Sequence, residues 1–145
     1  MTRTHRFRNT LAALATGLAL LTGHSASAQS MVSVKGNVLN MRSGPGTNTE
    51  VLWELRKGYP LKVVARQGNW LKVSDFENDR GWVARSLTGR TPHHVVKSRV
   101  ANIRSAPGTQ HRIVGKAEYG ELLRTREKRP DWVRVERDNG KTGWI

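Results

Sequence analysis

The sequence predicts an all-β protein made of two small barrels in tandem, and two observations lead to that prediction. Residues 34–83 match residues 96–145 at a constant offset of 62 positions without a gap, and 15 of these 50 positions are identical. Within each copy, short runs of β-branched or aromatic residues alternate with Gly, Pro, Asn or Asp, and no helical period is sustained. A sheet of such short strands protects its edges by closing into a barrel.

Five strands are expected in the first copy, because each run is bounded by turn residues. They cover residues 38–41, 51–55, 61–65, 70–74 and 82–84. Pro45-Gly46 suits the centre of a type II turn, since Pro fixes a negative φ and Gly accepts a positive one. Residues 75–81 are expected to form a hairpin loop.

Residues 1–28 have the features of a cleaved signal peptide. Residues 1–8 carry three arginines and no acid, residues 11–21 are almost wholly apolar, and Ala26-Ser27-Ala28 provides a cleavage site. The apolar run is too short to span a bilayer as an ordinary helix, although an uncleaved anchor is the alternative. We therefore expect a periplasmic or secreted protein with no transmembrane segment in the mature chain.

The chain is strongly basic, with 25 Lys and Arg against 11 Asp and Glu. Without residues 1–28 the formal net charge is still +11, so the excess belongs to the mature protein. This charge favours anionic surroundings such as an acidic polysaccharide, a membrane surface or nucleic acid. Export makes nucleic acid an unexpected partner, and the absence of cysteine means that the fold forms without disulfides.

The motifs shared by the two copies resemble a known family. Each copy carries Asn-x-Arg-Ser-x-Pro-Gly-Thr, starting at Asn40 and Asn102, then a Lys-Gly or Tyr-Gly turn, Trp-x-x-Val, and Gly-Trp-Val or Gly-Trp-Ile. In this order they resemble the bacterial Src-homology-3 (SH3b) domain, a small barrel. The resemblance places one domain at 31–92 and a second at 93–145, and it implies a non-catalytic binding module of an exported protein.

The second copy is shorter than the first. Ile145 aligns with Val83, so residues 84–95 have no counterpart, and the second barrel is expected to lack its last strand. Its edge could be covered by the first copy, by a second molecule, or by a partner that adds a strand. A shortened barrel that is simply tolerated is the remaining alternative.

Catalysis, cofactors and metal ions are not expected. When the two copies are aligned at the offset of 62, none of the 11 acidic residues matches an acidic residue in the other copy. No nucleophile motif or phosphate-binding loop is present either. His93, His94 and His111 would hold a metal only if the fold brought them together, and a solvated polar linker is the preferred interpretation of His93 and His94.

Alternation along the Trp-containing strands indicates a binding face. With Leu71 and Val73 in the core, Trp70 and Lys72 lie outside, and a Trp beside a cation offers a flat apolar surface to a peptide or a sugar. Packing over the barrel lip is the alternative for both Trp70 and Trp132, whereas Trp82 and Trp144 are expected in the core. The predicted ligand-binding residues are Trp70, Lys72, Trp53, Tyr59, Arg42, Trp132 and Arg134.

The copies differ in character. The first is richer in aromatic residues, whereas the second carries 12 basic and 6 acidic residues against 8 and 5. Arg42 either binds a ligand carboxylate or holds the carbonyls of the Pro-Gly loop. The second copy is predicted to present an electrostatic surface, with an ordinary solvated face as the alternative. Its residues are Arg124, Arg126, Lys128 and Arg129.

The sequence thus favours a non-catalytic exported binding module that recognises peptidoglycan or a peptide through an aromatic groove. The alternative is a scaffold that binds a periplasmic protein through the incomplete second barrel. Binding that survives high salt and depends on Trp70 would favour the groove over simple charge attraction.

Overall fold

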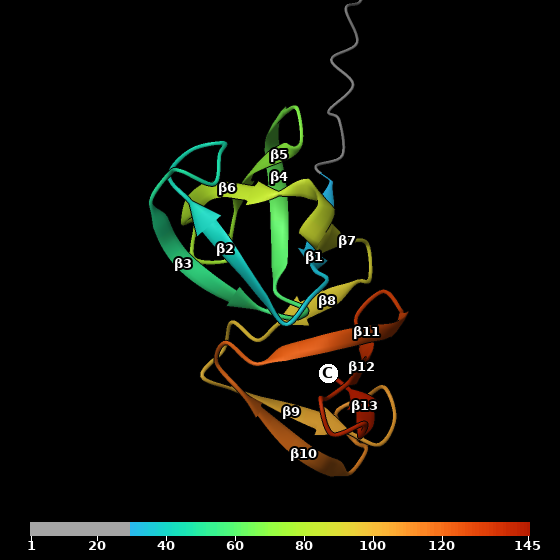
Figure 1. Ribbon diagram of the computed structural model, residues 1–145. Helices are drawn as coiled ribbons and strands as arrows, with labels where there is room; N and C mark the ends of the chain where they lie inside the picture. The colour runs from blue at the N-terminus through green and yellow to red at the C-terminus, as the bar shows by residue number, and fades with distance from the viewer. Residues whose placement is uncertain (1–29) are drawn as a thin grey trace, which may run out of the picture.

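The computed structural model describes residues 30–145, so the predicted signal peptide lies outside the described residues. Almost all of the regular structure in this part of the chain is β-strand, arranged as one sheet in each repeat (Figure 1). The all-β prediction is therefore confirmed. In residues 30–145 no helix has the length and apolar character needed to cross a membrane.

The first sheet contains the five predicted strands, a short closing strand within residues 84–95 as expected, and one further strand, Met31–Val34, that was not predicted. The spatial order is β3-β2-β6-β5-β4-β1-β7, and the paired strands are antiparallel. A turn of 3-10 helix, η1 (Arg85–Leu87), precedes the last strand. The strands are β1 (Met31–Val34), β2 (Val38–Arg42), β3 (Val51–Arg56), β4 (Pro60–Gln67), β5 (Trp70–Ser74), β6 (Arg80–Ala84) and β7 (Thr88–Gly89).

The second sheet repeats this arrangement without a counterpart of β7 in residues 30–145. Its order is β10-β9-β13-β12-β11-β8, so β8 takes the place of β1. The strands are β8 (His93–Val95), β9 (Val100–Arg104), β10 (Ile113–Glu118), β11 (Leu122–Lys128), β12 (Val133–Glu136) and β13 (Thr142–Trp144). His93 and His94 therefore belong to a strand, and the prediction of a solvated linker at these two residues is wrong.

Even the irregularities of the two sheets match. The register between β2 and β3 shifts at Leu52, and the register between β9 and β10 shifts at Val114. A second shift falls at Val64 in β4 and at Arg126 in β11. Both pairs lie 62 residues apart, the offset of the repeat. Because such bulges bend and twist a strand, they help each sheet to curl around its own core.

Each sheet encloses one apolar core, and the second core is smaller. Alternate residues of the strands point inward, as the sequence pattern predicts. The first core contains Val34, Leu39, Met41, Leu55, Leu61, Leu71, Val73 and Val83. The second contains Val96, Ile103, Ala117, Leu123 and Val135.

Two glycines allow the last core strand of each repeat to approach its neighbour. A Cβ at Gly81 would lie 2.9 Å from the Arg42 carbonyl oxygen, and one at Gly143 would lie 3.0 Å from the Arg104 carbonyl oxygen. Both distances are too short for an ordinary side chain, so β6 and β13 require glycine at the crossing.

The predicted type II turn at Pro45-Gly46 is wrong. Gly46 is not among the positive-φ residues of the described chain, and its N–H donates to the Gly44 carbonyl oxygen at 3.0 Å. The Thr49 hydroxyl lies 2.9 Å from the Gly44 oxygen and 2.7 Å from the Gly46 oxygen. A side-chain hydroxyl therefore closes this loop in place of the expected backbone turn.

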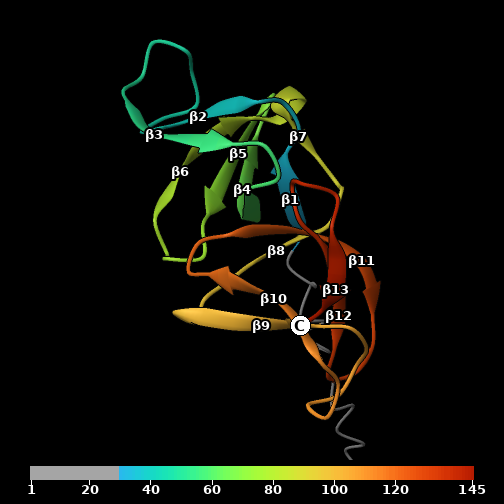
Figure 2. The same ribbon diagram turned by 90° about the horizontal axis from the view of Figure 1, so that it is seen from below.

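Three residues, 90–92, connect β7 to β8, and both views place β8 at the junction between the barrels (Figures 1 and 2). The Ser33 hydroxyl donates to the Thr91 carbonyl oxygen at 2.8 Å. Gly58 has a φ of +83°, and a Cβ there would lie 2.8 Å from the ring of His93. The second barrel is thus docked against the first by direct contacts.

An aromatic contact completes the junction. The rings of Phe76 and Tyr119 are 5.7 Å apart, and the Tyr119 hydroxyl donates to the Glu77 carboxylate at 2.7 Å. That hydrogen bond is the main reason why the pKa of Tyr119 is raised. On the first barrel, the ring of Tyr59 lies 6.0 Å from that of Phe76.

Candidate functional site

The register of the first sheet places an arginine, a tryptophan and a lysine in one row on its outer face. Lys72 of β5 pairs with Trp82 of β6, and Trp82 pairs with Arg42 of β2. Directly paired residues project from the same face of a sheet. Because Val73, the neighbour of Lys72, is fully buried, this row points away from the core. We call Arg42, Trp82 and Lys72, together with Trp70, the first outer row.

Trp70 extends this surface along β5. It precedes Lys72 by two residues and pairs with Ala84 of β6, so its side chain projects from the same outer face. Trp70, Lys72 and Trp82 are all half-buried. The expectation that Trp82 belongs to the core is wrong, because Val83 takes the inward position on β6 and its neighbour faces outward.

The second repeat contains the equivalent row, but its tryptophan is covered. Arg104, Trp144 and Arg134 are aligned by the same strand pairing. Trp144 is only 8% exposed, and the guanidinium carbon of Arg129 lies 4.6 Å from its ring centroid. This is the geometry of a cation–π contact. The position that matches Arg129 in the first repeat is Gln67, and no cation is stacked on Trp82 within residues 30–145.

Arg42 holds a loop. Its Nη1 donates to the carbonyl oxygens of Thr47 at 3.0 Å and Thr49 at 2.8 Å. In the second repeat, Nη1 of Arg104 donates to the His111 carbonyl oxygen at 2.8 Å. Of the two alternatives that the sequence left open for Arg42, the structure shows the loop contact. Arg42 thus positions the loop beside Trp82.

Two predicted aromatic residues lie away from the first outer row. Trp53 pairs with Met41, whose side chain is buried in the core, so Trp53 projects from the face opposite to Arg42 and is 54% exposed. Tyr59 lies in the turn before β4 and packs on Phe76 at the junction. Burial, followed by the nearby carboxylates of the 75–79 loop, raises the pKa of Tyr59 to about 12. Trp53, Tyr59 and Trp70 therefore do not form the single groove that was expected.

The predicted electrostatic surface is divided among several environments. Arg126 forms an ion pair with Glu136, and Arg129 forms one with Glu127 at 3.0 Å. Arg124 and Lys128 have no ion pair among the described residues, and they line two different hollows. The four cations therefore do not act as one surface.

The half-buried Trp132 lies just before β12, and the exposed Arg134 lies in that strand beside the covered Trp144. Among residues 30–145, no group of three His, Cys, Asp or Glu side chains is placed to hold a metal. Sequence reasoning missed Trp82, although the alternation that assigned Trp70 to the outer face would also have assigned Trp82 there.

The family matches coincide with the two repeats. Residues 35–89 match one family and residues 99–145 match another, both described as Bacterial SH3 domain. The protein named Putative N-acetylmuramoyl-L-alanine amidase YrvJ from Bacillus subtilis (strain 168) is 24% identical over 129 residues. That match covers 81% of this chain and 25% of the relative, so the chain spans about a quarter of the relative's length.

Solved structures give weak likenesses over most of the chain. NlpC1 from Trichomonas vaginalis has a TM-score of 0.39 at 16% identity, covering 83% of this chain and 45% of that one. An NlpC/P60 family protein from Bacillus cereus ATCC 10987 has a TM-score of 0.37 at 16% identity, covering 80% and 54%.

Proposed function

The chain belongs to the bacterial SH3 domain family, with one domain in each repeat, and on this basis we propose that it is a non-catalytic binding module of the cell envelope. The name of the Bacillus subtilis relative points to the cell wall, and this chain resembles about a quarter of that protein. The proposed ligand is peptidoglycan or a peptide, bound in the periplasm or outside the cell.

The first outer row supplies the binding surface. The indoles of Trp70 and Trp82 are partly exposed, and flat rings of this kind pack against sugar rings or peptide planes at little entropic cost. Lys72 projects from the same face and pairs with a ligand carboxylate. The observation that carries the proposal is that Trp82 is open where its counterpart Trp144 is covered by Arg129.

Co-sedimentation with purified peptidoglycan sacculi at low and high salt tests the proposal. The wild-type protein should remain bound at high salt, because contacts between rings and ligand are not screened as surface charges are. Trp70→Ala and Trp82→Ala should each reduce retention by about tenfold or more, since buried aromatic contacts dominate such interfaces.

Trp132→Ala is the matched control, because Trp132 occupies the position of Trp70 in the second repeat. It should bind as the wild type does, and circular dichroism should show that all three variants are folded. Retention that salt alone abolishes, or an equal loss in Trp132→Ala, would contradict binding through the first outer row.

A further inference from the structure

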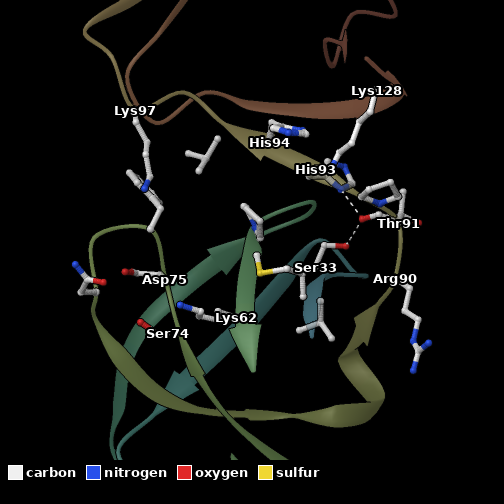
Figure 3. A pocket seen from close by; sticks show the side chains of 17 residues that line it. Ser33, Lys62, Ser74, Asp75, Arg90, Thr91, His93, His94, Lys97 and Lys128 are labelled. Carbon is white, nitrogen blue, oxygen red and sulfur yellow. Dashed lines mark hydrogen bonds between the residues drawn. The ribbon is translucent and has the colours of Figure 1, made fainter. Parts of the chain in front are cut away.

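A hollow of about 550 Å³ lies between the two barrels (Figure 3). The first barrel contributes β1, the start of β4 and the loop that follows β5. The second contributes β8 with Lys97 and Lys128, and the connection 90–92 borders one side. We call this hollow the β8 cleft. It is separate from the first outer row, since none of the four residues of that row lines it.

The β8 cleft is positively charged. Lys62 reaches it from the first barrel, Lys97 and Lys128 descend toward it from the second, and Arg90 is directed away (Figure 3). Asp75 is the only carboxylate among the lining residues. One of its oxygens, Oδ1, already accepts main-chain N–H groups from two residues of its own loop, each at 2.9 Å. Three lysines therefore face the cleft with little compensating charge, which favours an anionic ligand.

One wall of the cleft is an unpaired strand edge. In the first repeat, β7 pairs with the outer edge of β1, and the Lys35 N–H donates to the Leu87 carbonyl oxygen at 3.0 Å. In the second repeat, β8 pairs only with β11 among residues 30–145. Val95 and Lys97 match Ser33 and Lys35, and both line the cleft. Their outward main-chain groups are thus free to accept another strand.

The rest of the lining is largely apolar. Side chains of Met31, Val32, Pro60, Phe76 and Pro92 border the cleft. A hollow of this size is typical of sites that hold small molecules or short segments. A polysaccharide could satisfy the lysines, but it has no main-chain N–H and C=O groups at strand spacing. The edge of β8 therefore favours a peptide.

We propose that the β8 cleft binds an acidic peptide in extended conformation, which adds to β8 as an antiparallel strand. Its main chain pairs with Val95 and Lys97, as β7 pairs with β1 in the first repeat. Its carboxylates face Lys62, Lys97 and Lys128, and its apolar side chains contact Met31 and Phe76. This site operates independently of the first outer row.

A synthetic hexapeptide of alternating Glu and Val, added to the full chain, tests this proposal. By isothermal titration calorimetry we expect saturable binding, and hydrogen exchange at the Val95 and Lys97 amides should slow by about tenfold in the complex. Lys97→Gln and Lys128→Gln should each weaken binding by about threefold or more, because each removes one charge contact. Lys116→Gln, an exposed lysine outside the cleft, is the matched control and should bind normally.

Two further peptides separate strand addition from charge attraction. A peptide with Gln in place of Glu should bind at least tenfold more weakly. A peptide with Pro in place of Val keeps the charge but loses the main-chain N–H of every second residue, and φ at those residues is fixed at about −65°, so it should pair poorly as a strand and bind at least tenfold more weakly. Equal binding of the proline peptide would overturn strand addition. Slow exchange at Val95 and Lys97 in the unliganded protein would overturn it too, because the edge would then already be paired. Binding that persists in Trp82→Ala separates this site from the first outer row.

Discussion

The two repeats share strand order and bulge positions, yet they expose the tryptophan of their last core strand differently. Trp82 is half-buried and open, whereas Trp144 is covered by the guanidinium of Arg129. The matching residue in the first repeat is Gln67, which carries no charge. One surface residue thus distinguishes a partly exposed tryptophan from a covered one, at equivalent positions of two similar sheets.

The largest expected difference between the repeats is in stability. Trp144→Ala should lower the free energy of unfolding by about 3 kcal/mol or more, as removal of a buried aromatic ring does. Trp82→Ala should cost only about 1–2 kcal/mol, because the indole of Trp82 is already partly exposed to solvent in the folded protein. Urea denaturation of both variants, followed by tryptophan fluorescence, measures the difference. Equal losses would mean that Arg129 does not bury Trp144 in solution.

Removing the two loop-holding arginines should give the next largest effect. Arg42 donates to two loop carbonyls and Arg104 donates to one. Arg42→Met should therefore destabilise the protein by about 1 kcal/mol more than Arg104→Met does, the net value of one hydrogen bond. Denaturation midpoints at constant m-value give the comparison. A larger loss in Arg104→Met would contradict these hydrogen bonds.

Exchanging the residues at positions 129 and 67 should expose Trp144 and cover Trp82. Arg129→Gln should cost about 0.5–1 kcal/mol through loss of the cation–π contact, and it should make Trp144 accessible to acrylamide quenching. The reverse change, Gln67→Arg, should cover Trp82 and weaken retention on sacculi. If Gln67→Arg binds sacculi as the wild type does, then a cation at position 67 does not cover Trp82 or does not block binding to the first outer row.

The smallest effect concerns pH and lies in the second repeat. Burial, followed by the charges of Lys128 and His93, lowers the pKa of His94 from its ordinary value of 6.5, and its Nδ1 lies 2.6 Å from the Thr125 hydroxyl. Below pH 6.5 the unfolded chain therefore binds this proton more readily than the folded chain, so stability should fall as the pH drops.

The decline should begin near pH 6.5 and end below the folded-state pKa of His94. His94→Gln should flatten it, whereas His111→Gln, in a loop of the same repeat, is the control. Urea midpoints measured from pH 8 to pH 5 provide the test. An unchanged pH profile in His94→Gln would show that another group is responsible.

Much of the fold could be predicted from local pattern. The strands of the first repeat were predicted from alternation and turn residues, since side chains on opposite faces of a strand differ in polarity. The short strand Thr88–Gly89 has no such alternation. Its extended conformation goes with its pairing to β1, a contact that the local sequence does not reveal. The turn at Pro45-Gly46 was predicted wrongly because the hydroxyl of Thr49, a few residues further along the chain, binds the Gly44 and Gly46 carbonyl oxygens.

The site was harder to predict than the fold, because it depends on which strands are neighbours. Alternation assigned Trp70 to the outer face, but only the pairing of β6 with β5 and β2 places Trp82 between Lys72 and Arg42. The covering of Trp144 by Arg129 is likewise a contact between side chains that sequence spacing does not reveal.

The ring of His93 packs against Gly58 in the first repeat, and within the described part of the chain no equivalent contact exists at Gly120 in the second, so the two repeats could not exchange places without losing this contact. Gly58 and Gly120 occupy matching turns with φ of +83° and +79°. Yet a Cβ at Gly120 would have no atom of residues 30–145 within 4 Å, apart from its two chain neighbours. The turn at Gly58 therefore accommodates the imidazole ring of the second repeat's first strand, whereas the turn at Gly120 has no such role. A chimera with the two repeats in reversed order would keep the residues of both barrel cores but lose the contact between His93 and Gly58. Rearranging such domains would therefore change their mutual orientation before it changed either fold.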